Sequence, residues 1–307
     1  MKNRELCRLE KCTAAMGSAC SIVLYGHDPV EMEAAIYAAF DELRRIEALL
    51  SVFLPASEWS EINRSAAVKE VTVSAEVHTL LSSCMRYSKE SEGAFDITVG
   101  PLMKAWGVCA GMGRVPTRSE LEAAMLNVGY RHIRLDAAAL SVRLERPGME
   151  INPGGIGKGF AVDRMAEVLR HYGFRTALVT ASASSIYGMG IPPTESEGWR
   201  ITVPSLKNPR MSSTEMFLRD RSISTSATYE KTFWADGRLF SHIIDPRSGY
   251  PVQGRRMVSV VAPRTIDSEA WTKAFLLNGR EWAVRNKPGD FSVLLSEEGN
   301  ETECTWL

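Results

Sequence analysis

A glycine-rich turn that opens a helix is the segment whose residue types most clearly predict binding chemistry. The chain reads INPGGIGKGF from residue 151, and the apolar stripe that follows predicts a helix that ends at Gly173. Glycines between 154 and 159 leave backbone amides unshielded at the helix start, where the helix dipole favours an anion such as phosphate. Lys158 adds a mobile positive charge. The spacing fits neither GxGxxG nor GxxxxGK(S/T), and a turn used only for close packing is the alternative.

A histidine and an aspartate three residues apart are the candidates for proton transfer. In FSHIIDPRSGYPV, His242 precedes Asp245, and the turn DPRSGYP follows directly. Imidazole titrates near neutral pH, and the carboxylate of Asp245 would either orient the ring or act as the base itself. An aspartate before proline is also an ordinary start of a turn, so a structural role stays open for both residues.

Several helices must position these residues. Apolar residues at three-and-four spacing predict a helix over 32–50 that begins at Asp28, and a second helix from 74 that ends near Gly93. A shorter helix follows the capping pair Thr117 and Glu120 and is expected to stop at Gly129. The segment EGAFDITVGPLMKAWGV, with Asp96 in its middle, predicts a buried strand, turn and helix.

The predicted strands do not alternate strictly with these helices. Runs rich in β-branched residues and bounded by turn formers predict strands at 20–26, 175–182, 199–204, 222–228 and 256–263. A doubly wound sheet requires a regular βαβ order, so the sequence predicts an α+β fold instead.

Composition excludes several classes of protein. The 307 residues carry a net charge of -1, with 45% hydrophobic and 24% charged residues, which excludes disorder and predicts no nucleic-acid partner. No apolar stretch is long enough for a membrane span, and the charged start predicts a cytoplasmic protein. A periplasmic or membrane-anchored protein is the alternative if the sequence was trimmed. The six cysteines lack CxxC spacing, which predicts free thiols rather than a zinc site or disulfides.

Six sequence blocks, in order, resemble the ApbE-type FAD:protein FMN transferases. The blocks are MGSACSIVLYG, LLSVFLPASEWSEIN, GAFDITVGPLMKAWG, NPGGIGKGFAVDRMAEVL, SHIIDPRSGYPV and IDSEAWTKAFLLNG. The resemblance implies cleavage of FAD and transfer of its FMN half to a threonine of an acceptor flavoprotein, with release of AMP. It also implies a single domain over 1–307, with 1–14 as a candidate disordered segment. The fold it implies is related to the T-fold, with mixed sheets packed against helices and an active site in a cleft between two lobes.

The resemblance further implies roles for individual residues. His242 and Asp245 would lie near the acceptor hydroxyl. Contacts to the flavin substrate, FAD, are implied at Met16, Phe53, Gly93, Ala94, Phe95, Asn152, Lys158 and Ile243. A divalent cation, normally Mg²⁺, would bind the backbone carbonyl of Gly155 and the start of an ADALST-like helix, where it would neutralise the bridging phosphates.

The ADALST-like block departs from the family pattern at the metal ligands. It reads SEAWTK over 268–273, so Glu269 stands at the ligating aspartate and Lys273 at the ligating threonine. A register shift of one residue would place Thr272 there instead. A protonated lysine has no lone pair for Mg²⁺, so Lys273 would either repel the metal or replace it as a fixed positive charge.

Other departures concern the same predicted pocket. Asn152 replaces an aspartate, and TSA over 225–227, with Ala227, replaces TSG. TASAS over 180–184, with Ser182, Ala183 and Ser184, replaces NAGGD. These changes predict an altered cofactor site. Two functions therefore remain beside FMN transfer: a non-catalytic FAD-binding carrier or regulator, and an FAD pyrophosphatase that gives FMN and AMP.

Overall fold

The protein is described by a computed structural model that covers residues 5–108, 111–204, 206, 213–298 and 306–307. The chain divides into two compact units, and neither is contiguous in the sequence. The first unit consists of Met1–Glu47, Ile156–Ser226 and Met257–Leu307, and the second consists of Ala48–Gly155 and Ala227–Arg256. The α+β class predicted from the sequence is confirmed.

A seven-stranded sheet forms the centre of the first unit. Its strand order is β1-β2-β6-β7-β10-β13-β14, and every pair from β1 to β10 is antiparallel. The strands are β1 (Cys7–Ala15), β2 (Ser18–Gly26), β6 (Ala177–Ala181), β7 (Ser185–Met189), β10 (Arg221–Ala227), β13 (Arg256–Ala262) and β14 (Ser292–Glu297). A separate hairpin pairs β8 (Trp199–Pro204) with β9 (Ser213–Leu218).

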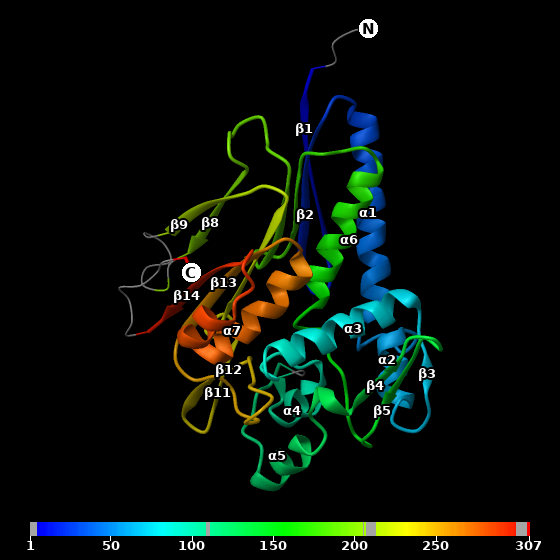
Figure 1. Ribbon diagram of the computed structural model, residues 1–307, viewed down its shortest axis with the longest axis vertical. Helices are drawn as coiled ribbons and strands as arrows, with labels where there is room; N and C mark the ends of the chain where they lie inside the picture. The colour runs from blue at the N-terminus through cyan, green and yellow to red at the C-terminus, as the bar shows by residue number, and fades with distance from the viewer. Residues whose placement is uncertain (1–4, 109–110, 205, 207–212, 299–305) are drawn as a thin grey trace. The chain divides into compact units, whose positions relative to one another are not determined.

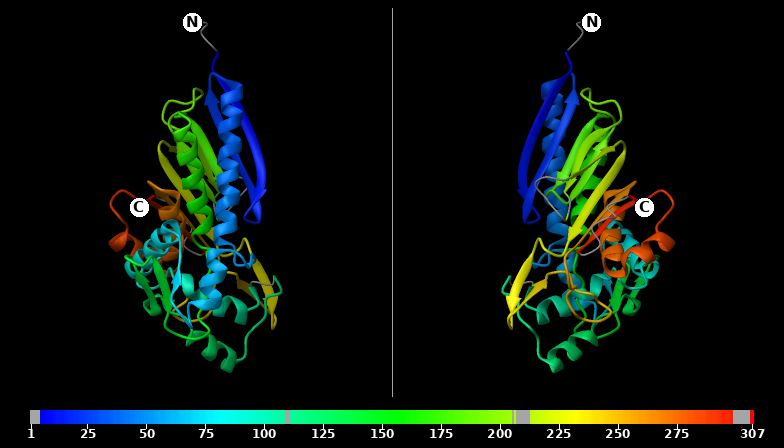
Figure 2. Two further views of the ribbon diagram at one scale, coloured as in Figure 1. Left: turned by 90° about the vertical axis from the view of Figure 1, so that its right-hand side faces the viewer. Right: turned by 90° about the vertical axis from the view of Figure 1, so that its left-hand side faces the viewer.

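Three long helices accompany this sheet (Figure 1): α1 (Pro29–Leu50), α6 (Gly157–His171) and α7 (Thr265–Asn286). In the side views, α1 and α6 run next to each other (Figure 2), and Arg164 of α6 donates to Glu42 of α1 at 3.1 Å. Helix α1 begins where predicted, because the Asp28 carboxylate accepts hydrogen bonds from the amides of Val30 and Glu31. Its apolar stripe is fully buried, from Met32 to Leu50.

The second unit combines short helices with two small sheets. The helices are α2 (Glu58–Ser65), α3 (Ala75–Glu90), α4 (Gly100–Ala105) and α5 (Arg118–Met125), with 3₁₀ turns η1 (Ile97–Val99) and η3 (Tyr130–His132). One sheet has the order β3-β5-β4, and the other is the hairpin of β11 and β12. These strands are β3 (Val71–Thr72), β4 (Ile133–Asp136), β5 (Ser141–Leu144), β11 (Thr232–Ala235) and β12 (Arg238–Ser241).

Trp106 lies at the centre of a core cluster in the second unit. Its ring contacts Phe233 and Phe240 of the hairpin, and its indole nitrogen donates to the Gly249 carbonyl at 2.8 Å. The cluster also contains Leu102 and Ile244. Two stretches of the second unit, 48–155 and 227–256, therefore build one core, although residues 156–226 of the first unit separate them in the sequence.

Two expectations about element ends need correction. Disorder was expected over 1–14, but Cys7–Ala15 forms β1, which pairs along its full length with β2; residues 1–4 lie outside the described part. Helix α5 has the predicted Thr117–Glu120 capping box but ends at Met125, four residues before the predicted stop at Gly129. The buried strand predicted at the start of EGAFDITVGPLMKAWGV is wrong: residues 94–95 form a bend and 97–99 form the 3₁₀ turn η1, because the Asp96 carboxylate accepts from the amide and hydroxyl of Thr98. The other predicted helices and the five strands predicted from β-branched runs are confirmed. Across the described residues, the structure contains no helix long and apolar enough to cross a membrane.

Candidate functional site

The glycine-rich turn leads directly into α6, as predicted, and one of its glycines is required for helix packing. A Cβ placed on Gly159 would lie 2.5 Å from the Thr265 carbonyl oxygen of α7. The amide of Gly159 donates to the carboxylate of Glu269, which also lies on α7. Close packing is therefore a property of this turn, and a side chain of the protein already accepts from the Gly159 amide.

Glu269 is the centre of a charged cluster in the first unit. It is 3% exposed, and its carboxylate lies 4.0 Å from the ammonium nitrogen of Lys273, one turn further along α7. That ammonium also donates to the Glu269 carbonyl at 3.1 Å. Burial lowers the pKa of Lys273 to about 8, an effect that Glu269 opposes and the charge of Lys158 reinforces.

Lys158 lies in the first turn of α6 and belongs to the same cluster. Its ammonium donates to the Ser184 hydroxyl at 2.9 Å. Ser184 stands where the resemblance implies an acid, so the Lys158 charge is hydrogen-bonded by a neutral group at this contact. We call Lys158, Glu269 and Lys273 the lysine–glutamate cluster.

The hydroxyl of Thr272 is used in two hydrogen bonds within the protein, so it is not available as a metal ligand. It donates to the Glu269 carbonyl at 2.7 Å and forms a second hydrogen bond with the Ser226 hydroxyl at 2.8 Å. The residue is fully buried. The two possible registers place either Lys273 or Thr272 at the position of the family's ligating threonine. Of these two side chains, it is that of Lys273 that reaches the Glu269 carboxylate.

The residues at this position do not fit a divalent cation. Mg²⁺ binds through oxygen ligands, mainly carboxylates, and keeps a near-octahedral shell. Here the single carboxylate, Glu269, already accepts from the Gly159 amide and pairs with the Lys273 ammonium. Within the described residues, no group of three or more His, Cys, Asp or Glu side chains could hold a metal ion. Gly155, the other expected ligand, belongs to the second unit.

The turn between β6 and β7 keeps a glycine-like conformation without a glycine. Ser182 has a φ of +62°, in the left-handed region, and its amide donates to the Ala19 carbonyl at 2.8 Å. The sequence comparison with NAGGD places a glycine here. Ser182 therefore adopts a backbone conformation that glycine adopts readily and that a residue with a side chain disfavours.

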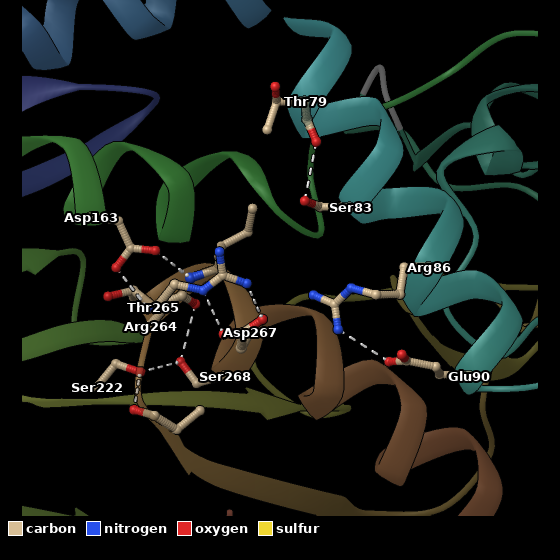
Figure 3. Close-up of polar contacts among 12 residues, drawn as sticks. Thr79, Ser83, Arg86, Glu90, Asp163, Ser222, Arg264, Thr265, Asp267 and Ser268 are labelled. Carbon is tan, nitrogen blue, oxygen red and sulfur yellow. Dashed lines mark hydrogen bonds and ion pairs between the residues drawn. The ribbon is translucent and has the colours of Figure 1, made fainter. Parts of the chain in front are cut away.

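Asp163 is a structural residue of this site that the sequence analysis missed. Its two carboxylate oxygens accept from the amides of Thr265 and Ile266, at 2.7 and 2.9 Å, and so cap the N-terminus of α7 (Figure 3). Burial raises the pKa of Asp163 to about 6. The spacing offers a signal, because Asp163 lies four residues after Gly159 and so on the same face of α6.

Met16 completes the predicted residues of the first unit. It lies in the turn between β1 and β2 with a φ of +53°, and its amide donates to the Glu47 carboxylate at 2.5 Å. The structure therefore fixes the backbone of Met16 through a side chain of α1.

His242 and Asp245 lie in the second unit and have different surroundings. The Nδ1 atom of His242 is 2.9 Å from the Lys231 carbonyl, so Nδ1 carries the proton and Nε2 is the basic nitrogen of the neutral ring. The Asp245 carboxylate accepts three hydrogen bonds from Arg247, all of 2.9 Å. Both oxygens of the Asp245 carboxylate are occupied by the guanidinium and the backbone amide of Arg247, so the geometry favours His242 over Asp245 as the base.

The segment Gly93–Phe95, which we call the GAF segment, and the turn that begins Asp245-Pro246-Arg247, which we call the DPR turn, are neighbours within the second unit. Gly93 has a φ of +79°, and a Cβ added to it would lie 3.9 Å from the Arg247 side chain. Ala94 and Phe95 are buried, and Ile243 is half-buried beside His242. The GAF residues are therefore brought to the turn that follows the predicted base.

Asp96 has a structural role, as the cap of the 3₁₀ turn η1. Its buried carboxylate accepts from the amide and hydroxyl of Thr98 and from the amide of Tyr130, at 2.7 to 2.8 Å. Burial raises its pKa.

A cavity of about 530 Å³ in the second unit brings two other predicted residues together. Asn152 and Phe53 both line it, and the Phe53 ring is 80% exposed. The Asn152 side chain accepts from the Gly154 amide at 2.8 Å and so stabilises the glycine turn. The remaining lining residues are Val52, Pro55, Ser60, Asn63, Arg64, Gly100, Lys104, Glu150 and Ile151.

Comparison with known proteins gives consistent similarities. A family model described as the ApbE family matches residues 16–294. An FAD:protein FMN transferase of Klebsiella pneumoniae (strain 342) is 32% identical over 262 residues, which are 84% of this chain and 78% of that protein. A protein of the same name from Treponema pallidum is 28% identical and covers 93% of this chain, with 83% of that protein covered.

Solved structures share the fold. The ApbE protein of Thermotoga maritima matches with a TM-score of 0.82 at 25% identity, over 96% of this chain and all of that chain. The flavinyl transferase ApbE of Pseudomonas stutzeri matches with a TM-score of 0.86 at 24% identity, over 98% of this chain and 94% of that chain.

Proposed function

This chain belongs to the ApbE family, and we propose that it is an FAD:protein FMN transferase that uses a threonine of a flavoprotein as acceptor. The observation that carries the proposal is the lysine–glutamate cluster beside the glycine-rich turn. Lys273 pairs with the Glu269 carboxylate, whereas Lys158 donates to the neutral Ser184 hydroxyl, which leaves net positive charge near the start of α6. A pyrophosphate diester such as that of FAD has the matching negative charge.

The reaction is a displacement at phosphorus. The acceptor hydroxyl oxygen attacks the FMN phosphorus, the bond from that phosphorus to the bridging oxygen breaks, and AMP leaves with the bridging oxygen. The hydroxyl proton goes to His242 Nε2, because Nδ1 already donates to the Lys231 carbonyl. Asp245 holds Arg247 and the turn, and acts as a positioning residue.

The lysine–glutamate cluster supplies the electrostatic part of the reaction. The charge of Lys158 is not neutralised by its hydroxyl partner Ser184, so it is available to the departing AMP phosphate. Pre-organised positive charge at this position lowers the barrier because negative charge accumulates on the leaving group in the transition state.

The second unit offers the site for the flavin ring. The 530 Å³ cavity presents the exposed Phe53 ring together with Asn152, an apolar face and a polar group that suit a ring with hydrogen-bonding edges. Gly93 lies beside Arg247 of the DPR turn in the same unit.

Product analysis tests the proposal. The protein is incubated with FAD and a flavoprotein domain that carries the target threonine, and the same domain with threonine replaced by alanine is the control. We expect covalent flavin fluorescence on the first domain only, with one AMP released per flavin attached. Free FMN and AMP without an acceptor would identify a pyrophosphatase, and intact FAD in every sample would identify a binding protein. Either result would overturn FMN transfer.

A further inference from the structure

We infer that the ammonium group of Lys273 replaces the divalent cation of the site in this protein, so that the FAD pyrophosphate binds to two lysines without a metal. The inference rests on the proposed function, because it concerns the phosphates of the same substrate. It differs from the family expectation of Mg²⁺ at this position, and that disagreement follows from the side chains present.

The first step of the argument is the environment of the carboxylate. Glu269 is almost completely buried, and both the Gly159 amide and the Lys273 ammonium neutralise its charge from within the protein. A divalent cation would have to approach an ammonium about 4 Å from its only carboxylate ligand, and like charges at this range repel strongly in a partly buried site.

The second step is the balance of charge. Lys158 and Lys273 carry two positive charges against one negative charge of Glu269, and the partner of Lys158 is the neutral Ser184. An acid at position 184 would cancel the charge of Lys158. The cluster thus carries a net charge of +1 without a bound metal ion. It therefore suits a phosphate anion rather than a cation.

The third step excludes the alternative ligand. Thr272 would be the ligand if the register shifted by one residue, but its hydroxyl proton is directed to the Glu269 carbonyl and its oxygen accepts from Ser226. The residue is fully buried in these contacts. Lys273 is therefore the residue of α7 that faces the carboxylate at this turn.

Metal binding and FAD binding are measured separately. Mn²⁺ binding, followed by electron paramagnetic resonance without FAD, reports a divalent site directly. FAD affinity is measured by titration with EDTA and with a series of Mg²⁺ concentrations. For the natural protein we expect no Mn²⁺ site tighter than millimolar and less than a twofold change of the FAD Kd between EDTA and Mg²⁺.

Three variants sharpen the test. Lys273→Met removes the charge with little change of volume and is expected to weaken FAD binding roughly tenfold or more. Lys273→Thr combined with Glu269→Asp restores the family ligands, and we expect this variant to bind Mn²⁺ and to require Mg²⁺ for FAD. Lys89→Met, at an exposed lysine in the last turn of α3, is the matched control and is expected to behave as the natural protein. Thermal unfolding of each variant checks that it is folded.

The outcomes distinguish this inference from the proposed function. A Mn²⁺ site in the natural protein, Mg²⁺-dependent FAD binding, or unchanged FAD affinity of a folded Lys273→Met variant would overturn the inference and leave FMN transfer standing. Absence of FAD binding in the natural protein under every condition, with or without Mg²⁺, would instead overturn the proposed function and the inference with it.

Discussion

At the scale of single residues, the structure distinguishes two side chains, His242 and Asp245, that the sequence offers equally as the base. His242 directs Nδ1 to a backbone carbonyl, whereas Asp245 is bound by Arg247. His242→Ala is therefore expected to lower turnover by about 10² to 10⁴ with little change of FAD affinity, because a positioned base contributes about this much. Single-turnover AMP release and FAD titration check this. His171→Ala, at an exposed histidine of α6, is the control, and equal losses in both variants would remove the role of His242.

Asp245→Asn is expected to affect stability more than turnover, in contrast with His242→Ala. The amide keeps one acceptor for Arg247 but loses the charge, so we expect a smaller loss of turnover than for His242→Ala, together with lower stability of the turn. Turnover at saturating FAD and thermal unfolding are measured for both variants. A larger loss of turnover in Asp245→Asn, without loss of stability, would make the carboxylate the base.

Ser182 is a residue at which the backbone and the side chain disagree. Its φ of +62° is costly for a residue with a Cβ, so Ser182→Gly is expected to stabilise the protein by roughly 0.5 to 1 kcal/mol. Urea unfolding measures the change. The neighbouring Ala183 has no positive φ, and Ala183→Gly is expected to destabilise by a similar amount. Destabilisation in both variants would mean that the Ser182 side chain stabilises the turn by more than its backbone strain costs.

At the scale of elements, Asp163 connects α6 to the start of α7 and makes stability depend on pH. Its pKa is raised by burial to about 6 in the folded protein, so folding favours its protonated form. The contribution of this form is complete below the unfolded pKa, about 4, and is lost as pH rises through 6. The stability of the natural protein relative to Asp163→Asn should therefore fall between pH 4 and 6 and stay level above 7.

Urea unfolding of both proteins from pH 4.5 to 7.5 measures this difference. A relative stability that instead grows with pH would mean that the two amides of Thr265 and Ile266, with the dipole of α7, lower the pKa below its usual range.

At the scale of the whole molecule, the order of segments determines which pieces fold alone. The second unit needs Ala227–Arg256, because Trp106 packs on Phe233 and Phe240 and donates to Gly249. A fragment of residues 48–155 is therefore expected to remain without native tertiary structure. The same fragment joined to residues 227–256 by a flexible linker of about 20 residues is expected to fold. Dispersion of amide signals in proton NMR separates the two. A native-like spectrum of the shorter fragment would show that the hairpin is dispensable.

Much of the fold follows from short-range patterns. The capping residues Asp28 and Thr117 begin the helices they were expected to begin, and the β-branched runs form strands. These features depend on contacts within a few residues, which is the range that a sequence pattern describes. The edge strand β1 was missed because its half-exposed, charged residues have no such signature, and only pairing with β2 defines it.

The sequence by itself also determined the candidate residues: the glycine turn, His242, and the lysine at position 273. Their partners were decided only by tertiary structure. The packing of α6 on α7 places Glu269 against Gly159 and lets Asp163 cap α7, and the burial of Thr272 leaves Lys273 as the partner of the carboxylate. Charge, protonation and ligand preference depend on what lies within a few ångströms. Residues more than a hundred positions apart, such as Gly159 and Glu269, reach that distance only through the packing of whole elements.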